Sequence, residues 1–307
     1  MESLRPKEML LKIIVILICF LVGMKIIIPL LMHTYEKNNW SLKYISRAID
    51  DTWYEDDLIP PPEGHINASL WLARDAINSN KISLAYTLIE PFIYLDNPFA
   101  LSILGDALIL EHKIYEAFEI WVDIRDVSSL LEFAKTAEER GDWVEALDAY
   151  KNVLTLDPNN SLVYFTIGQI TAKQYKYPEA DSWFQRAIEL NPKREWQLKR
   201  ARVAKEAGNL SLSRVIYEQM ISQYPSFAQI YVELSWVFYL DQKFPEAETS
   251  IESALQFMPF PRANYYLRAG RIYEKVGKTQ KAIESYEKVL TIEPENNVAL
   301  KRLKVLR

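Results

Sequence analysis

Cysteine, histidine and glycine are scarce in this chain of 307 residues, and each scarcity excludes a class of protein. Cys19 is the only cysteine, so no disulfide can form within the chain. His33, His65 and His112 do not lie at ligand spacing from one another or from the cysteine, so we expect no metal site. Only 8 residues are glycine, which disfavours sandwiches, barrels and sheets with glycine-rich loops.

The sequence also lacks the short motifs of common enzymes. It contains no G-x-x-x-x-G-K-[ST], no G-x-S-x-G, no H-E-x-x-H and no glycine-rich phosphate loop. The formal net charge is −5, which is opposite to the basic footprint of a nucleic-acid-binding protein. We therefore expect no catalytic residue, no cofactor, no nucleic acid and no small-molecule substrate.

A hydrophobic run near the N-terminus predicts a membrane anchor. Residues 13–32, IIVILICFLVGMKIIIPLLM, number 20, and a helix of that length crosses a bilayer core. Lys25 interrupts the run, and the bilayer tolerates one lysine whose long stem reaches toward the headgroups. A cleaved signal peptide is the alternative, but no small-residue cleavage site follows the run. We expect residues 1–33 to form a short tip and an uncleaved transmembrane helix.

The charges beside this run favour one orientation only slightly. Three basic residues precede it and three follow within 15 residues, but the preceding ones lie closer. A short basic N-terminus normally stays in the cytoplasm. We therefore expect a single-pass protein with a cytoplasmic N-terminus and with its large domain on the extracytoplasmic side.

Residues 34–65 read as a neck between the anchor and that domain. Apolar residues at helical spacing over 40–49 indicate a short helix, which either lies on the bilayer surface or packs under the next element. Three consecutive prolines at 60–62 favour an extended, semi-rigid spacer. The acidic residues around them are expected to be solvated.

The rest of the chain repeats at about 34 residues. Amphipathic helical patterns end at prolines that follow one another at steps of 34, 33, 34 and 35 residues, namely Pro158, Pro192, Pro225, Pro259 and Pro294. Four of these patterns have an alanine at the same aligned position: Ala146, Ala180, Ala247 and Ala282. Self-similarity at this period is typical of a repeat array, in which each unit buries its apolar face against its neighbours.

Two units carry the fullest pattern. Residues 161–193 present Tyr164, Ile167, Gly168, Ala180, Phe184, Ala187 and Pro192, and residues 263–296 present Tyr266, Ala269, Gly270, Tyr273, Ala282, Tyr286 and Pro294. These units resemble tetratricopeptide repeats, which are helix-turn-helix units of 34 residues. The small residues suit a close crossing of the two helices of one unit, and the aromatic residue near the middle of the second helix is expected to fill the gap to the next unit.

This resemblance implies an all-α, right-handed superhelical solenoid. We expect seven units, the first two degenerate, at 66–97, 98–126, 127–160, 161–193, 194–227, 228–262 and 263–296. Residues 297–307 are expected to form a capping helix with a basic end.

The resemblance also implies that the first helix of each unit lines a concave surface that binds peptides or partner proteins. Candidate partner-binding residues at those positions are Arg74, Phe99, Lys135, Phe165, Arg202, Lys205, Trp236, Tyr239 and Arg271. Aromatic side chains with scattered cations suit a segment with acidic or aromatic residues. Leucines at 70, 131 and 198 stand where one subfamily has the lysine that holds chaperone tails, so we expect no such tail to bind.

These features together predict a membrane-anchored scaffold for protein–protein interaction. Charge reversal at Arg202, Lys205 and Arg271 is expected to weaken partner capture while the array stays folded. Two alternatives remain open: a regulatory, non-catalytic subunit of a membrane-associated enzyme, and an architectural tether without a binding surface.

Overall fold

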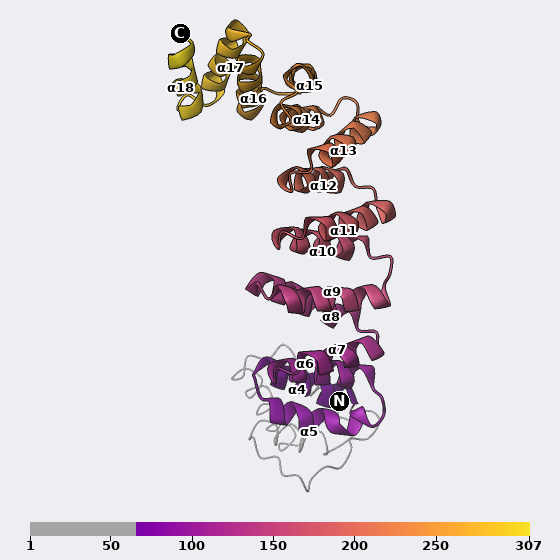
Figure 1. Ribbon diagram of the computed structural model, residues 1–307. Helices are drawn as coiled ribbons and strands as arrows, with labels where there is room; N and C mark the ends of the chain where they lie inside the picture. Colours follow the sequence, from indigo (N-terminus) through magenta and orange to yellow (C-terminus); the bar gives the residue numbers. More distant parts are fainter. Residues whose placement is uncertain (1–65) are drawn as a thin grey trace, which may run out of the picture. The chain divides into compact units, whose positions relative to one another are not determined.

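The computed structural model describes residues 66–307, and this part of the chain consists of helices joined by short turns, without a strand (Figure 1). The expected all-α class is thus confirmed over these residues. The predicted anchor at 13–32 and the neck at 34–65 lie outside the described residues. From Ile66 to the end of the chain, no helix combines the length and the hydrophobicity that crossing a membrane requires.

The chain divides into two compact units at Phe133 and Ala134, called unit 1 and unit 2 below. The described part of unit 1 contains α4 (Ile66–Asn78), α5 (Ile82–Ile93), α6 (Pro98–Leu110), α7 (Ile114–Asp123) and the start of α8 (Val127–Arg140). Unit 2 contains the rest of α8, then α9 (Trp143–Leu156), α10 (Ser161–Lys173), α11 (Tyr177–Leu190), α12 (Arg194–Glu206), α13 (Leu210–Gln223), α14 (Ala228–Leu240), α15 (Phe244–Phe257), α16 (Ala263–Lys275), α17 (Thr279–Ile292) and α18 (Asn297–Leu306).

One pair of helices lies within each of the seven expected ranges, and α18 follows them. The turn inside each pair contains one residue in the left-handed region of backbone space. Glycine fills this place at 141, 208 and 277, where φ is +84°, +76° and +76°, because it adopts that conformation without steric cost. Elsewhere the place is taken by Asn80, His112, Tyr175 and Gln242.

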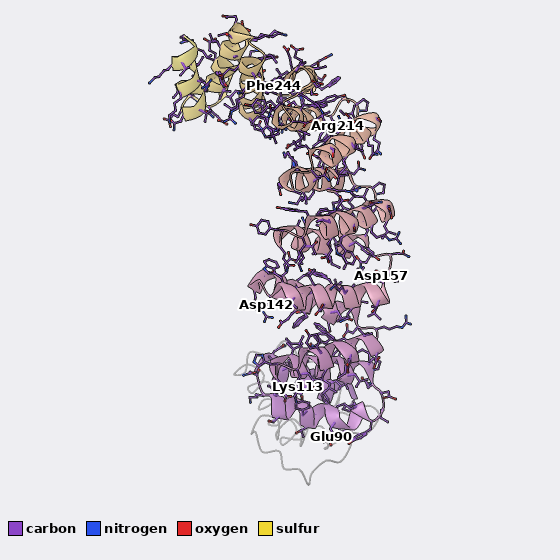
Figure 2. All side chains as sticks on the ribbon, viewed as in Figure 1. Glu90, Lys113, Asp142, Asp157, Arg214 and Phe244 are labelled. Atoms are coloured by element: carbon purple, nitrogen blue, oxygen red, sulfur yellow. The ribbon has the colours of Figure 1, made fainter. Side chains whose placement is uncertain are left out.

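Small residues and aromatic rings explain how tightly the paired helices approach. Figure 2 draws the described side chains on the ribbon. A Cβ atom added at Gly168 would lie 2.8 Å from Cδ1 of Phe184, and one added at Gly270 would lie 2.7 Å from Tyr286. In unit 1 the same substitution at Gly105 would overlap the indole of Trp121. Real Cβ atoms do not approach other carbons so closely, so each glycine makes room for its ring.

The core of unit 2 continues from repeat to repeat. One cluster of buried side chains runs from Leu198 on α12 to Leu303 on α18, and it includes the fully buried rings of Tyr217 and Tyr286. The apolar side of α18 covers the last pair, where Arg302 forms an ion pair with Glu274. Each helix pair therefore completes its core with residues of its neighbours, as a solenoid requires.

Candidate protein-binding surfaces

The candidate residues from the sequence lie in different environments on the first helices. Arg74 and Phe99 lie together in unit 1. Five others lie on α12, α14 and α16 in unit 2: Arg202, Lys205, Trp236, Tyr239 and Arg271. Lys135 is exposed on α8, whereas Phe165 is buried on α10. The Phe165 ring stacks on Trp196 with centroids 4.7 Å apart, so it belongs to the core and offers little surface to a partner.

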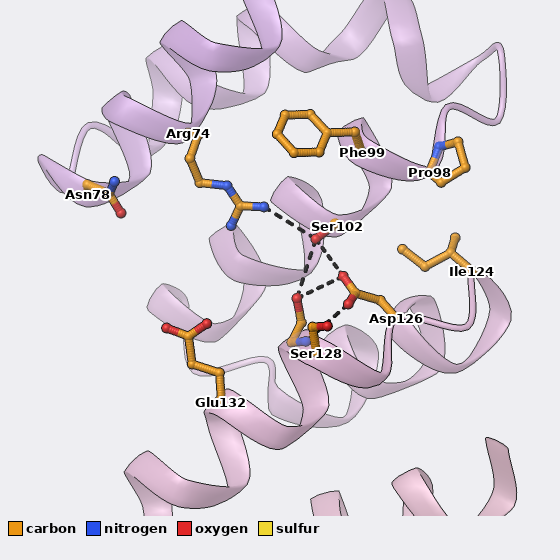
Figure 3. Close-up of a pocket in the computed structure, with 10 residues that line it drawn as sticks. Arg74, Asn78, Pro98, Phe99, Ser102, Ile124, Asp126, Ser128 and Glu132 are labelled. Carbon is orange, nitrogen blue, oxygen red and sulfur yellow. Dashed lines mark hydrogen bonds between the residues drawn. The ribbon is translucent and has the colours of Figure 1, made fainter. Parts of the chain in front are cut away.

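A pocket of about 700 Å³ lies between α4, α6 and the start of α8; we call it the Arg74 pocket (Figure 3). Its lining residues are Arg74, Asn78, Pro98, Phe99, Ser102, Ile124, Asp126, Ser128, Ser129 and Glu132. Pro98, Phe99 and Ile124 make an apolar side, and the remaining residues are polar or charged. The pocket is thus amphipathic, with charged groups from α4 (Arg74), from the residue before α8 (Asp126) and from α8 (Glu132).

Arg74, a candidate partner-binding residue from the sequence, is paired within unit 1. Its guanidinium forms an ion pair with Asp106 and donates a hydrogen bond to Oγ of Ser102 at 3.3 Å. Asp126 and Glu132 lie close enough to interact electrostatically with it. One guanidinium against three carboxylates gives a formal charge of −2, so this site repels an acidic partner rather than attracting it.

Asp126 has two roles: its carboxylate accepts hydrogen bonds that hold the local structure, and it carries a negative charge. Its carboxylate accepts hydrogen bonds from Ser102 Oγ at 2.7 Å, from Ser129 Oγ at 2.8 Å and from the Ser129 backbone N–H at 3.0 Å. The last of these caps the N-terminus of α8. Burial raises the pKa of the Asp126 carboxyl, but the hydrogen bonds outweigh it and hold that pKa below its usual value. Asp126 is therefore ionised at neutral pH.

In unit 2, three cations surround one carboxylate; we call Glu233, Arg202, Lys205 and Arg268 the Glu233 cluster. Glu233 Oε1 lies 3.1 Å from Nη2 of Arg202, and Oε2 lies 2.9 Å from Nζ of Lys205 and 3.3 Å from Nη1 of Arg268. The Glu233 side chain is 10% exposed. Burial raises the pKa of Glu233, but the three cations outweigh it and lower that pKa below its usual value.

The Glu233 cluster contains an excess of positive charge. Three cations against one carboxylate give a formal charge of +2, on side chains that are partly exposed: Arg202 at 36% and Arg268 at 25%. The sequence suggests that the array stays folded when Arg202 and Lys205 are reversed, but this geometry makes a loss of stability the expected result. Such a reversal would place two new carboxylates beside a buried one, and like charges at that distance destabilise the fold.

An aromatic surface adjoins the cluster. Trp236 and Tyr239 stack with centroids 4.6 Å apart and planes 7° from parallel, and neither ring is fully buried. The guanidiniums of Arg268 and Arg271 lie 5.5 Å and 5.8 Å from the centroid of Trp236, within the range of a cation–π interaction. The structure thus brings together five of the seven unit 2 candidates on one face of α12, α14 and α16, whereas Lys135 and Phe165 lie on α8 and α10.

Sequence reasoning did not identify Glu233 and Arg268 as members of this site. A signal was present, because Glu233 is the only charged residue in the apolar sequence of α14, AQIYVELSWVFYL. A lone acid inside such a helix requires a counter-ion. Among the described residues, no three His, Cys, Asp or Glu side chains are grouped closely enough to hold a metal ion.

Comparison with known proteins identifies the repeats. Tetratricopeptide-repeat family models match residues 131–195 and 263–296. No curated protein matches the chain.

Solved structures of repeat proteins are similar to this chain. The C-terminal part of a TPR repeat-containing protein from Cytophaga hutchinsonii superposes with a TM-score of 0.51 at 14% identity, over 76% of this chain and 98% of that one. YrrB, described as a TPR protein with an unusual peptide-binding site, gives 0.48 at 18% identity, over 61% and 98% of the two chains. MamA from Desulfovibrio magneticus gives 0.48 at 18%, over 56% and 97%. Residues 131–195 and 263–296 are therefore tetratricopeptide repeats, and they belong to an all-helical solenoid that extends over the described residues.

Proposed function

We propose that this protein is a non-catalytic, membrane-anchored scaffold that binds partner proteins, for the assembly or recruitment of a complex at the membrane. Tetratricopeptide-repeat proteins are protein-interaction scaffolds, which supports the general part of this proposal. The binding surface that we assign is the face of α12, α14 and α16 that carries the Glu233 cluster, Trp236, Tyr239 and Arg271.

The excess positive charge of the Glu233 cluster is the observation on which this assignment rests. A partly exposed surplus of +2 beside two stacked rings is costly unless it attracts an anionic partner or is left well hydrated. Carboxylates of a partner can pair with the guanidiniums, and its aromatic side chains can pack on Trp236. The ligand is therefore an extended segment that contains acidic and aromatic residues.

Arg271→Glu is expected to weaken the binding of such a segment about tenfold, because the reversal replaces a charge-assisted contact by a repulsive one. Arg271 is preferable to Arg202 or Lys205 because it lies over Trp236 and does not belong to the Glu233 cluster. The probe is a labelled 12-residue peptide of alternating glutamate and tyrosine, measured by fluorescence anisotropy at two salt concentrations on the full chain.

The matched control is Arg186→Glu on α11. Arg186 also lies over an aromatic ring, that of Tyr164 at 6.0 Å, and the substitution changes the net charge by the same amount. Equal losses in the two variants, or equal affinity for a peptide with glutamine in place of glutamate, would contradict the assignment. An architectural tether without a binding surface would show no difference between any of these proteins. Crosslinking in native membranes followed by mass spectrometry then identifies the partner.

The membrane part of the proposal rests on the apolar run at residues 13–32. The full chain is expected to remain in the membrane pellet after alkaline carbonate extraction, and a chain without residues 1–33 is expected to leave it. Protease added to the cytoplasmic face of sealed vesicles should leave the repeat region intact, and added detergent should expose it. Digestion from the cytoplasmic face alone would reverse the proposed orientation.

A further inference from the structure

We propose that the Arg74 pocket binds a lysine or arginine side chain of a partner segment. This inference rests on the proposed function in one respect only, namely that the protein binds extended segments of other proteins. It assigns to unit 1 a ligand charge opposite to the one expected for the Glu233 cluster in unit 2. A segment bound in the pocket would therefore contribute a cation.

The first argument is the charge of the pocket. One terminal nitrogen of Arg74 pairs with Asp106 and the other donates a hydrogen bond to Ser102. The positive charge of Arg74 is therefore already paired within unit 1. Asp126 and Glu132 line the pocket as two further carboxylates, and the formal charge of Arg74, Asp106, Asp126 and Glu132 together is −2. A second cation would reduce this imbalance, whereas an anion would increase it.

The second argument is the arrangement of apolar and charged groups. Pro98, Phe99 and Ile124 give the pocket apolar lining, while Asp126, just before α8, and Glu132, further along α8, give it carboxylates (Figure 3). The aliphatic stem of lysine or arginine packs on apolar surface while its charged end seeks carboxylates. The pocket offers both, in a volume of about 700 Å³ that holds one such side chain and its neighbours.

Exposed aromatic surface continues from the pocket onto α4. The rings of Trp71 and Phe99 lie with their centroids 6.3 Å apart, and they are 49% and 40% exposed. Rings with this much exposure in a repeat protein are available to a ligand, and they can stack on the plane of an arginine. They can equally cover the aliphatic part of lysine.

Helix capping alone does not require the negative charge at Asp126. Asparagine caps helices about as well as aspartate, because the cap needs an oxygen that accepts a hydrogen bond from a backbone N–H. The Asp126 Oδ1 atom accepts that bond from Ser129, and a carboxylate oxygen can accept a further one. The cap and the charge can therefore be separated by substitution.

The experiment uses the full chain and 12-residue peptides of glycine, serine and one tyrosine, which differ only in a central lysine, arginine, glutamine or glutamate. Fluorescence anisotropy is expected to show that the lysine and arginine peptides bind about tenfold more tightly than the glutamine peptide, as expected for hydrogen bonds to charged groups. Asp126→Asn/Glu132→Gln should abolish this preference, because it removes two charges and keeps the cap. Glu132→Gln alone should reduce it.

Glu116→Gln/Glu119→Gln is the matched control, because it removes two carboxylates from the exposed side of α7 in the same unit. The preference should survive there. An equal loss in the control would show that general electrostatics causes the preference, and it would overturn the proposal, as would equal binding of the lysine and glutamine peptides. A concentration-dependent dimer that only the pocket variant loses would identify a second copy as the occupant, and would also overturn it. Arg271→Glu should not alter the lysine preference, so failure here is distinguishable from failure of the acidic-segment site.

Discussion

Replacement of Glu233 by glutamine is expected to lower the free energy of unfolding by about 3–5 kcal/mol, the usual cost of removing one partner from a buried ion pair. The glutamine keeps the size of the side chain but leaves Arg202, Lys205 and Arg268 facing one another without a counter-charge. Hydrogen exchange of α12, α14 and α16 measures the loss locally, which suits a solenoid because its repeats open separately.

The control is Glu252→Gln on α15. Glu252 pairs with Lys281 at 2.8 Å, but both side chains are nearly half exposed, so the expected cost is much smaller than for Glu233→Gln. A second variant, Glu233→Gln/Lys205→Met, removes one of the surplus cations and should recover part of the loss. Similar exchange rates for Glu233→Gln and Glu252→Gln would show that the cluster does not stabilise unit 2.

The cluster also predicts how stability depends on pH. The pKa of Glu233 is lower in the folded chain than its ordinary value of 4.5, so its contribution is fully present above that value. The contribution is lost as the pH falls through the folded pKa, because the protonated carboxyl no longer attracts the cations. The stability difference between the wild type and Glu233→Gln should therefore shrink below about pH 4.

Truncation of Trp121 to alanine is the second substitution with a large expected effect, about 3–5 kcal/mol of destabilisation. Trp121 is among the largest fully buried side chains, and it packs against Phe118 and Phe133 as well as Gly105. Its removal leaves a cavity between α6 and α7. Hydrogen exchange of these two helices is again the local measurement.

Gly105→Ala tests the same contact from the other side, and its effect should depend on the background. In the wild type the added methyl overlaps the indole, at an expected cost of about 1–3 kcal/mol. In Trp121→Ala the methyl enters the cavity, and alanine also favours the helix by up to about 1 kcal/mol over glycine. The substitution should then be neutral or stabilising. An equal cost in both backgrounds would show that the glycine has a role other than accommodating the ring.

The sequence predicts the fold well because the relevant patterns are local. Helix α10 begins at Ser161 and α16 at Ala263, the starts expected from the proline spacing. Small residues at fixed offsets from aromatic ones, such as Gly168 and Phe184, identify helices that cross within one unit. These relations lie within about 35 residues of chain, so a repeated pattern reveals them without any knowledge of the tertiary structure.

The site is harder to predict because its charges meet across helices. The position of Arg74 in the repeat predicts on which face of its helix it lies. It does not predict the ion pair with Asp106, a residue 32 positions away in the sequence. The charge expected to attract a partner is therefore neutralised in the structure. Glu233, in contrast, fixes the positions of Arg202, Lys205 and Arg268 around its carboxylate. Only the packing of α12, α14 and α16 brings these four side chains together.

The reversal of the chain inside each helix pair has a practical consequence for experiments. Gly208 and Gly277 have open space around the position of a Cβ atom, and both residues are exposed. Exposed loop tips of this kind are the positions where proteins tolerate inserted sequence. A fluorophore or an epitope placed in these turns would report on one repeat at a time.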